Sequence, residues 1–119
     1  MEKIRNFEDL DVWKISHQLV LEVYHLTRGF PKEELFGLAS QMRRAAASIP
    51  ANIAESFGRR NLKEKANFYN IAQGSASELR YYFILAKDLG YIPNIEQQLD
   101  RCDHIARMLH KMMDKMRTI

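Results

Sequence analysis

The sequence predicts an all-α protein, an antiparallel up-down-up-down four-helix bundle formed by a single domain over residues 1–119. Three observations favour this fold. Residues that form helices readily, such as Ala, Leu, Lys and Glu, are abundant, whereas the chain has only five glycines and three prolines. Apolar residues recur at spacings of three and four through most of the chain. The joints between these periodic segments are short, which places successive helices side by side and antiparallel.

The first helix is expected from about Asp9 to Thr27, with Asp9 or Asp11 capping its N-terminus. Its apolar stripe consists of Val12, Leu19, Val23 and Leu26. Gly29 and Pro31 indicate where it ends, because glycine adopts left-handed geometry easily and proline cannot continue a helix.

The second helix is expected to begin near Glu33 and to end at Gly58, with Pro50 in its interior. An interior proline costs on the order of 3 kcal/mol relative to alanine. The apolar spacing nevertheless continues across it, so we expect one helix with a kink at Pro50 rather than two helices. Ser48 and Asn52 can hydrogen-bond the carbonyls that the kink exposes. The apolar positions are Leu35, Leu38, Met42, Ala45, Ile49, Ile53 and Phe57.

Small residues predict a close crossing between the second and third helices. Ala45–Ala47 would let a neighbouring backbone approach, and Gly74 offers a flat position on the third helix. Because glycine costs roughly 1 kcal/mol relative to alanine inside a helix, we expect Gly74 to have a packing reason.

The third helix is expected to be capped by Asn61 and to run to about Leu89. Its apolar stripe is Phe68, Ile71, Ala72, Ser75, Leu79, Tyr82 and Ala86. After Gly90 and Pro93, the fourth helix alternates steps of four and three, which is a heptad seam. Its positions are Ile95, Leu99, Cys102, Ala106, Leu109, Met113 and Met116. Cys102 is therefore expected to be a small buried hydrophobic residue rather than a nucleophile.

Composition also bears on the compartment and on partners. The lone cysteine excludes an internal disulfide and suits a reducing environment. The N-terminal residues include acids where a signal peptide has an apolar stretch, and no apolar run reaches membrane-spanning length. We therefore expect a cytoplasmic protein. A net charge of +3 is weak evidence that a single chain binds nucleic acid.

Several helices have a broader apolar face than one narrow core requires. The side chains in excess are Trp13, Tyr69, Tyr81, Tyr82, Phe83 and Ile84. Surplus apolar surface usually marks an interface, so we expect self-association. A thick core with scattered exposed aromatic residues is the alternative.

The stretch around Pro50 reads Gln41-x-Arg43-Arg44-Ala45-Ala46-x-Ser48-Ile49-Pro50-x-Asn52-Ile53-Ala54-Glu55. It closely resembles the central signature of the 23S rRNA intervening-sequence protein family, which are small bacterial four-helix bundle proteins. Agreement extends over almost the whole chain, although Ser56 stands where the family usually has glycine. The resemblance implies a homopentamer, because family members and the related accessory proteins of diversity-generating retroelements form five-fold barrels. It also suggests nucleic-acid binding.

The sequence offers little for catalysis or metal binding. Glu22 and His25 have the Glu-x-x-His spacing that di-iron bundles use twice, and Glu55 and Glu78 stand on other helices, but a second copy of the motif is absent. Gly-rich phosphate loops, nucleophile elbows and zinc spacings are absent too. We expect a non-enzymatic protein with no cofactor and no metal, and a metal-binding bundle is the third alternative.

Two function hypotheses remain. In the first, an oligomer binds RNA or DNA non-specifically through basic surfaces, and five copies of a +3 chain would carry +15. The candidate residues are Arg59, Arg60, Lys63 and Lys65, or Arg107, Lys111, Lys115 and Arg117 in the basic C-terminal tail. A helix C-terminus balanced by its dipole and a solvated helix face are the structural alternatives for these cations. In the second, the bundle is a protein–protein interaction scaffold, with intersubunit ion pairs made by Arg43, Arg44 and Glu55.

Overall fold

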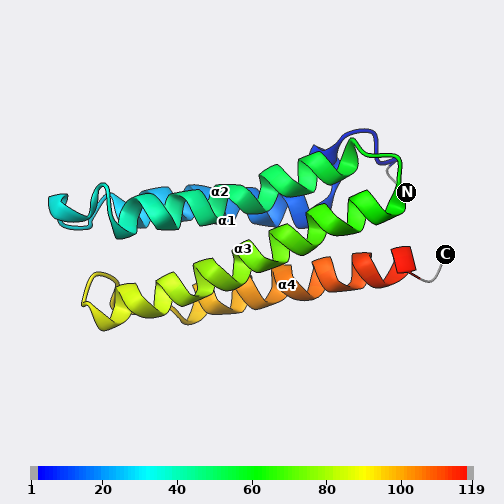
Figure 1. Ribbon diagram of the computed structural model, residues 1–119. Helices are drawn as coiled ribbons and strands as arrows, with labels where there is room; N and C mark the ends of the chain where they lie inside the picture. The colour runs from blue at the N-terminus through cyan, green and yellow to red at the C-terminus, as the bar shows by residue number, and fades with distance from the viewer. Residues whose placement is uncertain (1–2, 118–119) are drawn as a thin grey trace.

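Residues 3–117 form a bundle of four α-helices whose neighbours run antiparallel, as the sequence predicted (Figure 1). The computed structural model describes residues 3–117. Helix α1 contacts α2, α2 contacts α3, α3 contacts α4, and α4 contacts α1. The elements are the 3-10 helix η1 (Phe7–Asp9), α1 (Asp11–Thr27), the 3-10 helix η2 (Lys32–Glu34), α2 (Leu38–Phe57), α3 (Leu62–Asp88) and α4 (Glu96–Arg117).

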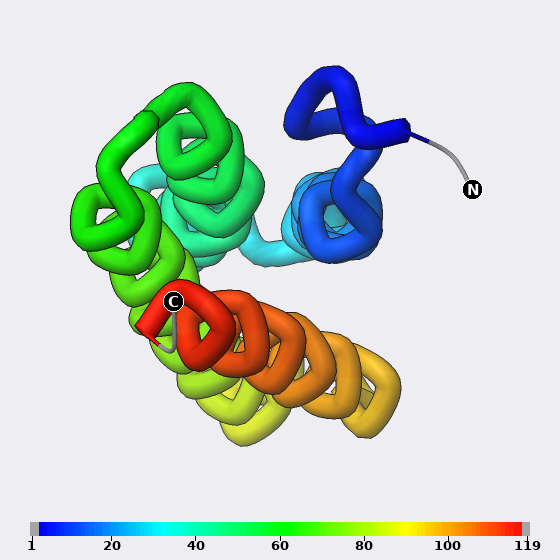
Figure 2. The backbone as a smooth tube through the Cα atoms, turned by 90° about the vertical axis from the view of Figure 1, so that its right-hand side faces the viewer, coloured from blue at the N-terminus to red at the C-terminus, as the bar shows by residue number. Residues whose placement is uncertain are grey.

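The four helix–helix interfaces are unequal. The α2–α3 interface is the most extensive and the α1–α4 interface is the smallest. A view along the bundle shows α2 and α3 side by side (Figure 2). Small residues on both helices are fully or almost fully buried there, which permits a close approach: Ala45, Ala46, Ala72 and Ala76.

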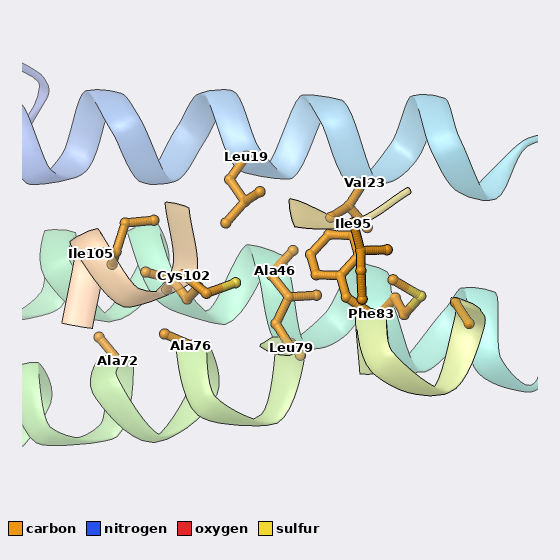
Figure 3. Close-up of a cluster of buried hydrophobic side chains, with 14 of the residues drawn as sticks. Leu19, Val23, Ala46, Ala72, Ala76, Leu79, Phe83, Ile95, Cys102 and Ile105 are labelled. Atoms are coloured by element: carbon orange, nitrogen blue, oxygen red, sulfur yellow. The ribbon is translucent and has the colours of Figure 1, made fainter. Parts of the chain in front are cut away.

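The core is apolar and receives side chains from every α-helix (Figure 3). Phe83 is the largest fully buried side chain. Leu19 and Val23 of α1 point into the cluster from one side, and Ile95, Cys102 and Ile105 belong to the same cluster. Cys102 is 1% exposed, so its predicted burial on the fourth helix is confirmed.

The start of α1 differs from the prediction. The helix begins at Asp11, and its N-cap residue is Leu10, which makes no side-chain capping bond. Asp9 instead belongs to η1, where its carboxylate accepts hydrogen bonds from the backbone N–H groups of Arg5 (2.9 Å) and Asn6 (3.1 Å). The prediction that Asp9 or Asp11 caps α1 was therefore wrong, because the Asp9 carboxylate bonds the backbone of the preceding turn.

The start of α2 was also predicted too early. Lys32–Glu34 form a separate 3-10 turn, and Gly37, with φ −112° and ψ −117°, separates it from the α-helix that begins at Leu38. Phe36 is 92% exposed and Leu35 is 50% exposed, so Leu35 is not a core position. The end of α1 also differs from the expectation, because Gly29 does not adopt left-handed backbone. Among the described residues, Gly90 (φ 81°), after α3, does.

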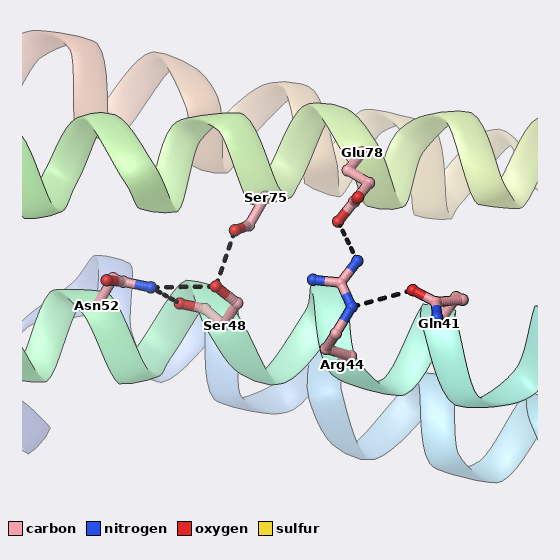
Figure 4. Close-up of polar contacts among 6 residues, drawn as sticks. All are labelled: Gln41, Arg44, Ser48, Asn52, Ser75 and Glu78. Atoms are coloured by element: carbon pink, nitrogen blue, oxygen red, sulfur yellow. Dashed lines mark hydrogen bonds and ion pairs between the residues drawn. The ribbon is translucent and has the colours of Figure 1, made fainter.

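Helix α2 continues through Pro50, which is buried inside it, so the prediction of one helix is confirmed. The kink at Pro50 stays a prediction. Proline removes the N–H that would bond the Ala46 carbonyl. Close to the proline, the Asn52 amide donates to the carbonyl (2.7 Å) and the hydroxyl (3.0 Å) of Ser48 (Figure 4). The Ser75 hydroxyl of α3 donates to the same Ser48 hydroxyl (2.8 Å), so this polar group joins α2 to α3.

The predicted close contact at Gly74 was wrong. A Cβ atom built on Gly74 would meet no atom of residues 3–117 within 4 Å, and the residue is exposed. Ile71 is also 44% exposed although the sequence placed it in the core. The buried positions of α3 are Tyr69, Ala72, Ala76, Leu79, Phe83 and Ala86. The helix is therefore rotated relative to the predicted stripe, and Gly74 lies on the solvent side.

The N-terminus of α3 was predicted correctly. The side-chain oxygen of Asn61 accepts hydrogen bonds from the backbone N–H groups of Lys63 (2.8 Å) and Glu64 (3.2 Å). Asn61 thus satisfies two of the donors that a helix leaves open at its first turn.

Candidate nucleic-acid interface

The two basic segments that the sequence offered as alternatives lie at one end of the bundle. Helix α2 ends there, α3 begins there and α4 ends there, because neighbouring helices are antiparallel (Figure 1). Residues 59–65 and the last turns of α4 therefore lie at the same end of the molecule. We call this part of the molecule the basic end.

A pocket of about 410 Å³ opens at the basic end between the first turns of α3 and the last turns of α4. We call it the α3–α4 pocket. It brings Lys63 from one predicted set together with Arg117 from the other. The remaining lining residues are Glu64, Ala66, Asn67, Asn70 and Met113. The sequence reasoning missed Asn67 and Asn70, although their spacing from Lys63 could have shown that they share a helix face.

Arg59 and Lys65, which are both candidate cations, have partners within the chain. The Arg59 guanidinium bonds the Glu55 carboxylate (3.0 Å) and lies 5.0 Å from the centre of the Phe68 ring. The Lys65 ammonium donates to the carbonyls of Ser56 (3.1 Å) and Phe57 (3.3 Å) at the end of α2. For Lys65 the structure thus favours the structural alternative, in which a cation balances a helix C-terminus.

Other candidate cations are open to a ligand. Within residues 3–117, the side chains of Arg60, Lys63, Arg107 and Lys111 are exposed and make no ion pair or hydrogen bond. Arg117 lies 3.9 Å from the Asp114 carboxylate, at the outer limit of an ion pair. Arg107 and Lys111 lie four residues apart, which places these two side chains in one row along α4.

The two adjacent arginines of the signature extend to different helices. Arg43 donates to the Thr27 hydroxyl (2.9 Å) and lies 4.9 Å from the centre of the Tyr24 ring, both on α1. Arg44 bonds the Glu78 carboxylate of α3 (2.6 Å), and this hydrogen bond raises the pKa of Arg44 (Figure 4). Both arginines, and Glu55 with Arg59, therefore have partners within their own chain.

The residues considered for metal binding or nucleophilic chemistry have other roles. Glu22 accepts hydrogen bonds from Gln98 (2.7 Å) and Arg101, which join α1 to α4. In the part of the chain that the structure describes, no group of three His, Cys, Asp or Glu side chains could hold a metal ion. Burial raises the pKa of Cys102 to about 12, so its thiol stays protonated near neutral pH.

A second surface is apolar and lies on the outer side of α1 and α2. We call it the α1–α2 groove; its volume is about 320 Å³. Trp13 stacks on His17, with ring centres 4.9 Å apart and planes 11° apart. Across from them, Pro50 and Ala51 belong to a run of small residues on α2. Among residues 3–117, the groove is lined by Phe7, Trp13, His17, Val20, Ala47, Pro50, Ala51 and Ala54.

The apolar side chains that the sequence showed in excess divide between core and surface. Tyr69 and Phe83 are buried, at 4% and 0% exposure, whereas Tyr81 is 56% exposed. Trp13, Tyr82 and Ile84 are half-buried at the edge of the core.

None of the helices found in residues 3–117 has the length and apolar character needed to cross a bilayer.

The contacts of Arg43, Arg44, Ser48 and Asn52 show that the signature holds three helices together. A family model described as 23S rRNA-intervening sequence protein matches residues 8–111. The chain belongs to this family. The match to the 23S rRNA-intervening sequence proteins runs from η1 into the second half of α4, and it confirms the resemblance seen in the sequence. A search of curated proteins found no match.

Proposed function

We propose that this 23S rRNA-intervening sequence protein is a non-enzymatic, oligomeric, cytoplasmic bundle whose basic end binds RNA or DNA without sequence preference. The observation that supports the proposal is the convergence of two cationic segments at one end, where Arg60 and Lys63 have no partner within residues 3–117. Cations of this kind attract phosphates and release the counterions that surround a nucleic acid. The proposal includes no metal and no cofactor.

Self-association would strengthen such binding. One chain carries a net charge of only +3, so several copies are needed to build a strongly positive surface. The α1–α2 groove supplies apolar surface that an interface could cover. The number five comes from the family resemblance. We therefore propose a homopentamer in which the basic ends act together.

The binding proposal is tested by titrating labelled RNA and DNA with the full chain at several salt concentrations. Each neutralised phosphate contributes about −0.7 to −0.9 to the slope of log affinity against log salt. We expect the double substitution Arg60→Ala and Lys63→Ala to flatten this slope. The matched control is Arg28→Ala with Lys87→Ala, which removes the same charge from the opposite end of the bundle.

Two results would contradict the proposal. One is an equal change in slope for both double variants, which would show that only net charge matters. The other is absence of binding at low salt by a sample that is oligomeric. That second result would leave the protein–protein scaffold as the better hypothesis.

The assembly is tested by light scattering coupled to size exclusion. We expect a pentamer mass for the wild type and a smaller species for Ala51→Arg, because Ala51 is exposed in the α1–α2 groove. Gln97→Arg adds the same charge near the start of α4 and should leave the mass unchanged. A wild-type monomer at micromolar concentration would refute the oligomer.

A further inference from the structure

The α3–α4 pocket has features that the charge of the basic end does not explain. We infer that this pocket receives one unpaired nucleotide, so that the protein prefers single-stranded nucleic acid to duplex. The inference rests on the proposed function and names the class of strand that it binds.

The first feature is a row of polar side chains on α3 that make no hydrogen bond within residues 3–117. Lys63, Asn67 and Asn70 follow one another at spacings of four and three, so they share one face of α3. All three are exposed, and their side chains make no hydrogen bond within residues 3–117. Each asparagine amide offers two donors and one acceptor in a plane. The edge of an unpaired base presents the same kinds of group, and paired asparagine–base contacts are common in recognition.

The second feature is the chemistry of the other walls. Ala66 and Met113 give the pocket an apolar part against which the face of a base can rest, and the methionine thioether makes favourable contacts with aromatic rings. The volume of about 410 Å³ falls within the range of small-ligand sites. The described residues that line the pocket include no aromatic side chain, so the base would be held mainly through its edge.

The third feature is the placement of charge. Lys63 lies on the α3 side of the pocket and Arg117 on the α4 side, so the phosphate of a bound nucleotide has a cation available from either helix. Glu64 is also on the wall and opposes anions, which favours a ligand with one phosphate near Lys63 rather than a dense polyanion. Arg60 is exposed three residues before Lys63, so it can contact the next phosphate of a strand.

A duplex cannot use this site without cost. Its base edges are already paired, and a base must be unstacked and rotated out of the helix before it can enter a pocket. A single strand offers its bases freely. The free amides therefore contribute to the binding of single strands, whereas the cations contribute to the binding of both forms.

The test compares a labelled 12-nucleotide single strand with the duplex of the same sequence, using the full chain at fixed salt. The double variant Asn67→Ala and Asn70→Ala changes no charge. We expect it to bind the single strand about tenfold more weakly, as loss of a paired amide–base contact does, and the duplex within about twofold of wild type. Gln18→Ala with Gln97→Ala removes two exposed amides elsewhere and should change neither affinity.

Competition with a nucleoside monophosphate identifies the form of ligand. Displacement of the strand by the monophosphate from wild type, but not from the asparagine variant, supports the pocket and shows that a free nucleotide fits it. Loss of single-strand affinity without such competition supports a nucleotide within a strand. Circular dichroism and the measured mass verify that the variant is folded and assembled.

The outcomes separate this inference from the proposed function. Equal weakening of single strand and duplex, or no weakening of either, overturns the nucleotide pocket while leaving electrostatic binding intact. Wild-type protein that binds neither form refutes the proposed function and the pocket together.

Discussion

Replacing Gly74 with alanine should stabilise the protein. Gly74 lies in the interior of α3, and a Cβ atom there would meet nothing within 4 Å in the described part of the chain. No packing cost is therefore expected, and alanine is favoured in a helix because it has less backbone entropy to lose on folding. Substitutions of this kind stabilise by about 0.4–1 kcal/mol. With an unfolding entropy of roughly 0.25 kcal/mol/K for a chain of this length, the melting temperature should rise by about 2–4 °C.

The assay is thermal and urea denaturation followed by circular dichroism, at one fixed protein concentration. Gly90→Ala is the matched control, because the left-handed backbone at Gly90 (φ 81°) strains any residue with a Cβ. That variant should be destabilised by about 1 kcal/mol. A lower melting temperature for Gly74→Ala would refute the reasoning, since it would mean that another surface covers Gly74 in the assembled protein.

Three further predictions concern single side chains. Phe83→Ala should cost about 3–5 kcal/mol in urea denaturation because Phe83 is fully buried, whereas Tyr81→Ala, which removes a 56% exposed ring, should cost far less. Asn61→Ala should lose about 1 kcal/mol through the missing cap, and Asn67→Ala, which removes no bond, should not. Burial raises the pKa of Cys102 from 9.0 to about 12. As the pH rises, the thiol therefore loses its proton at a lower pH in the unfolded chain than in the folded one. Stability should accordingly fall as the pH rises from about 9 toward 12, and Cys102→Ala should remove that part of the fall when unfolding is measured across this range.

The helices could be predicted from the sequence because their signals are local. Apolar spacing specified four helices, and Asn61 was identifiable as a cap because the residue type and its position before the helix suffice. The start of α2 was missed because acids and leucines near Glu33 favour a helix, whereas the backbone at Gly37 interrupts it. The spacing of apolar residues does not reveal such an interruption of the helical backbone.

Features that depend on how two helices meet were harder to predict. Gly74 looked like a contact position, but the rotation of α3 is decided by all of its buried residues together, and Ala72 and Ala76 face inward instead. The α3–α4 pocket was missed for the same reason. Lys63 and Arg117 are far apart in the chain, and only the antiparallel arrangement brings them to one cavity.

The two contacts that Arg44 and Ser48 make with α3 limit where the chain can gain or lose a residue. One extra or missing residue between Arg44 and Ser48 would turn the rest of α2 by about 100° relative to the arginines. Arg44 would then still bond Glu78 while Ser48 moved away from Ser75, so the two contacts with α3 could not form together. Changes of length should therefore be excluded from this part of the helix and tolerated in the joints before Leu38 and after Leu89.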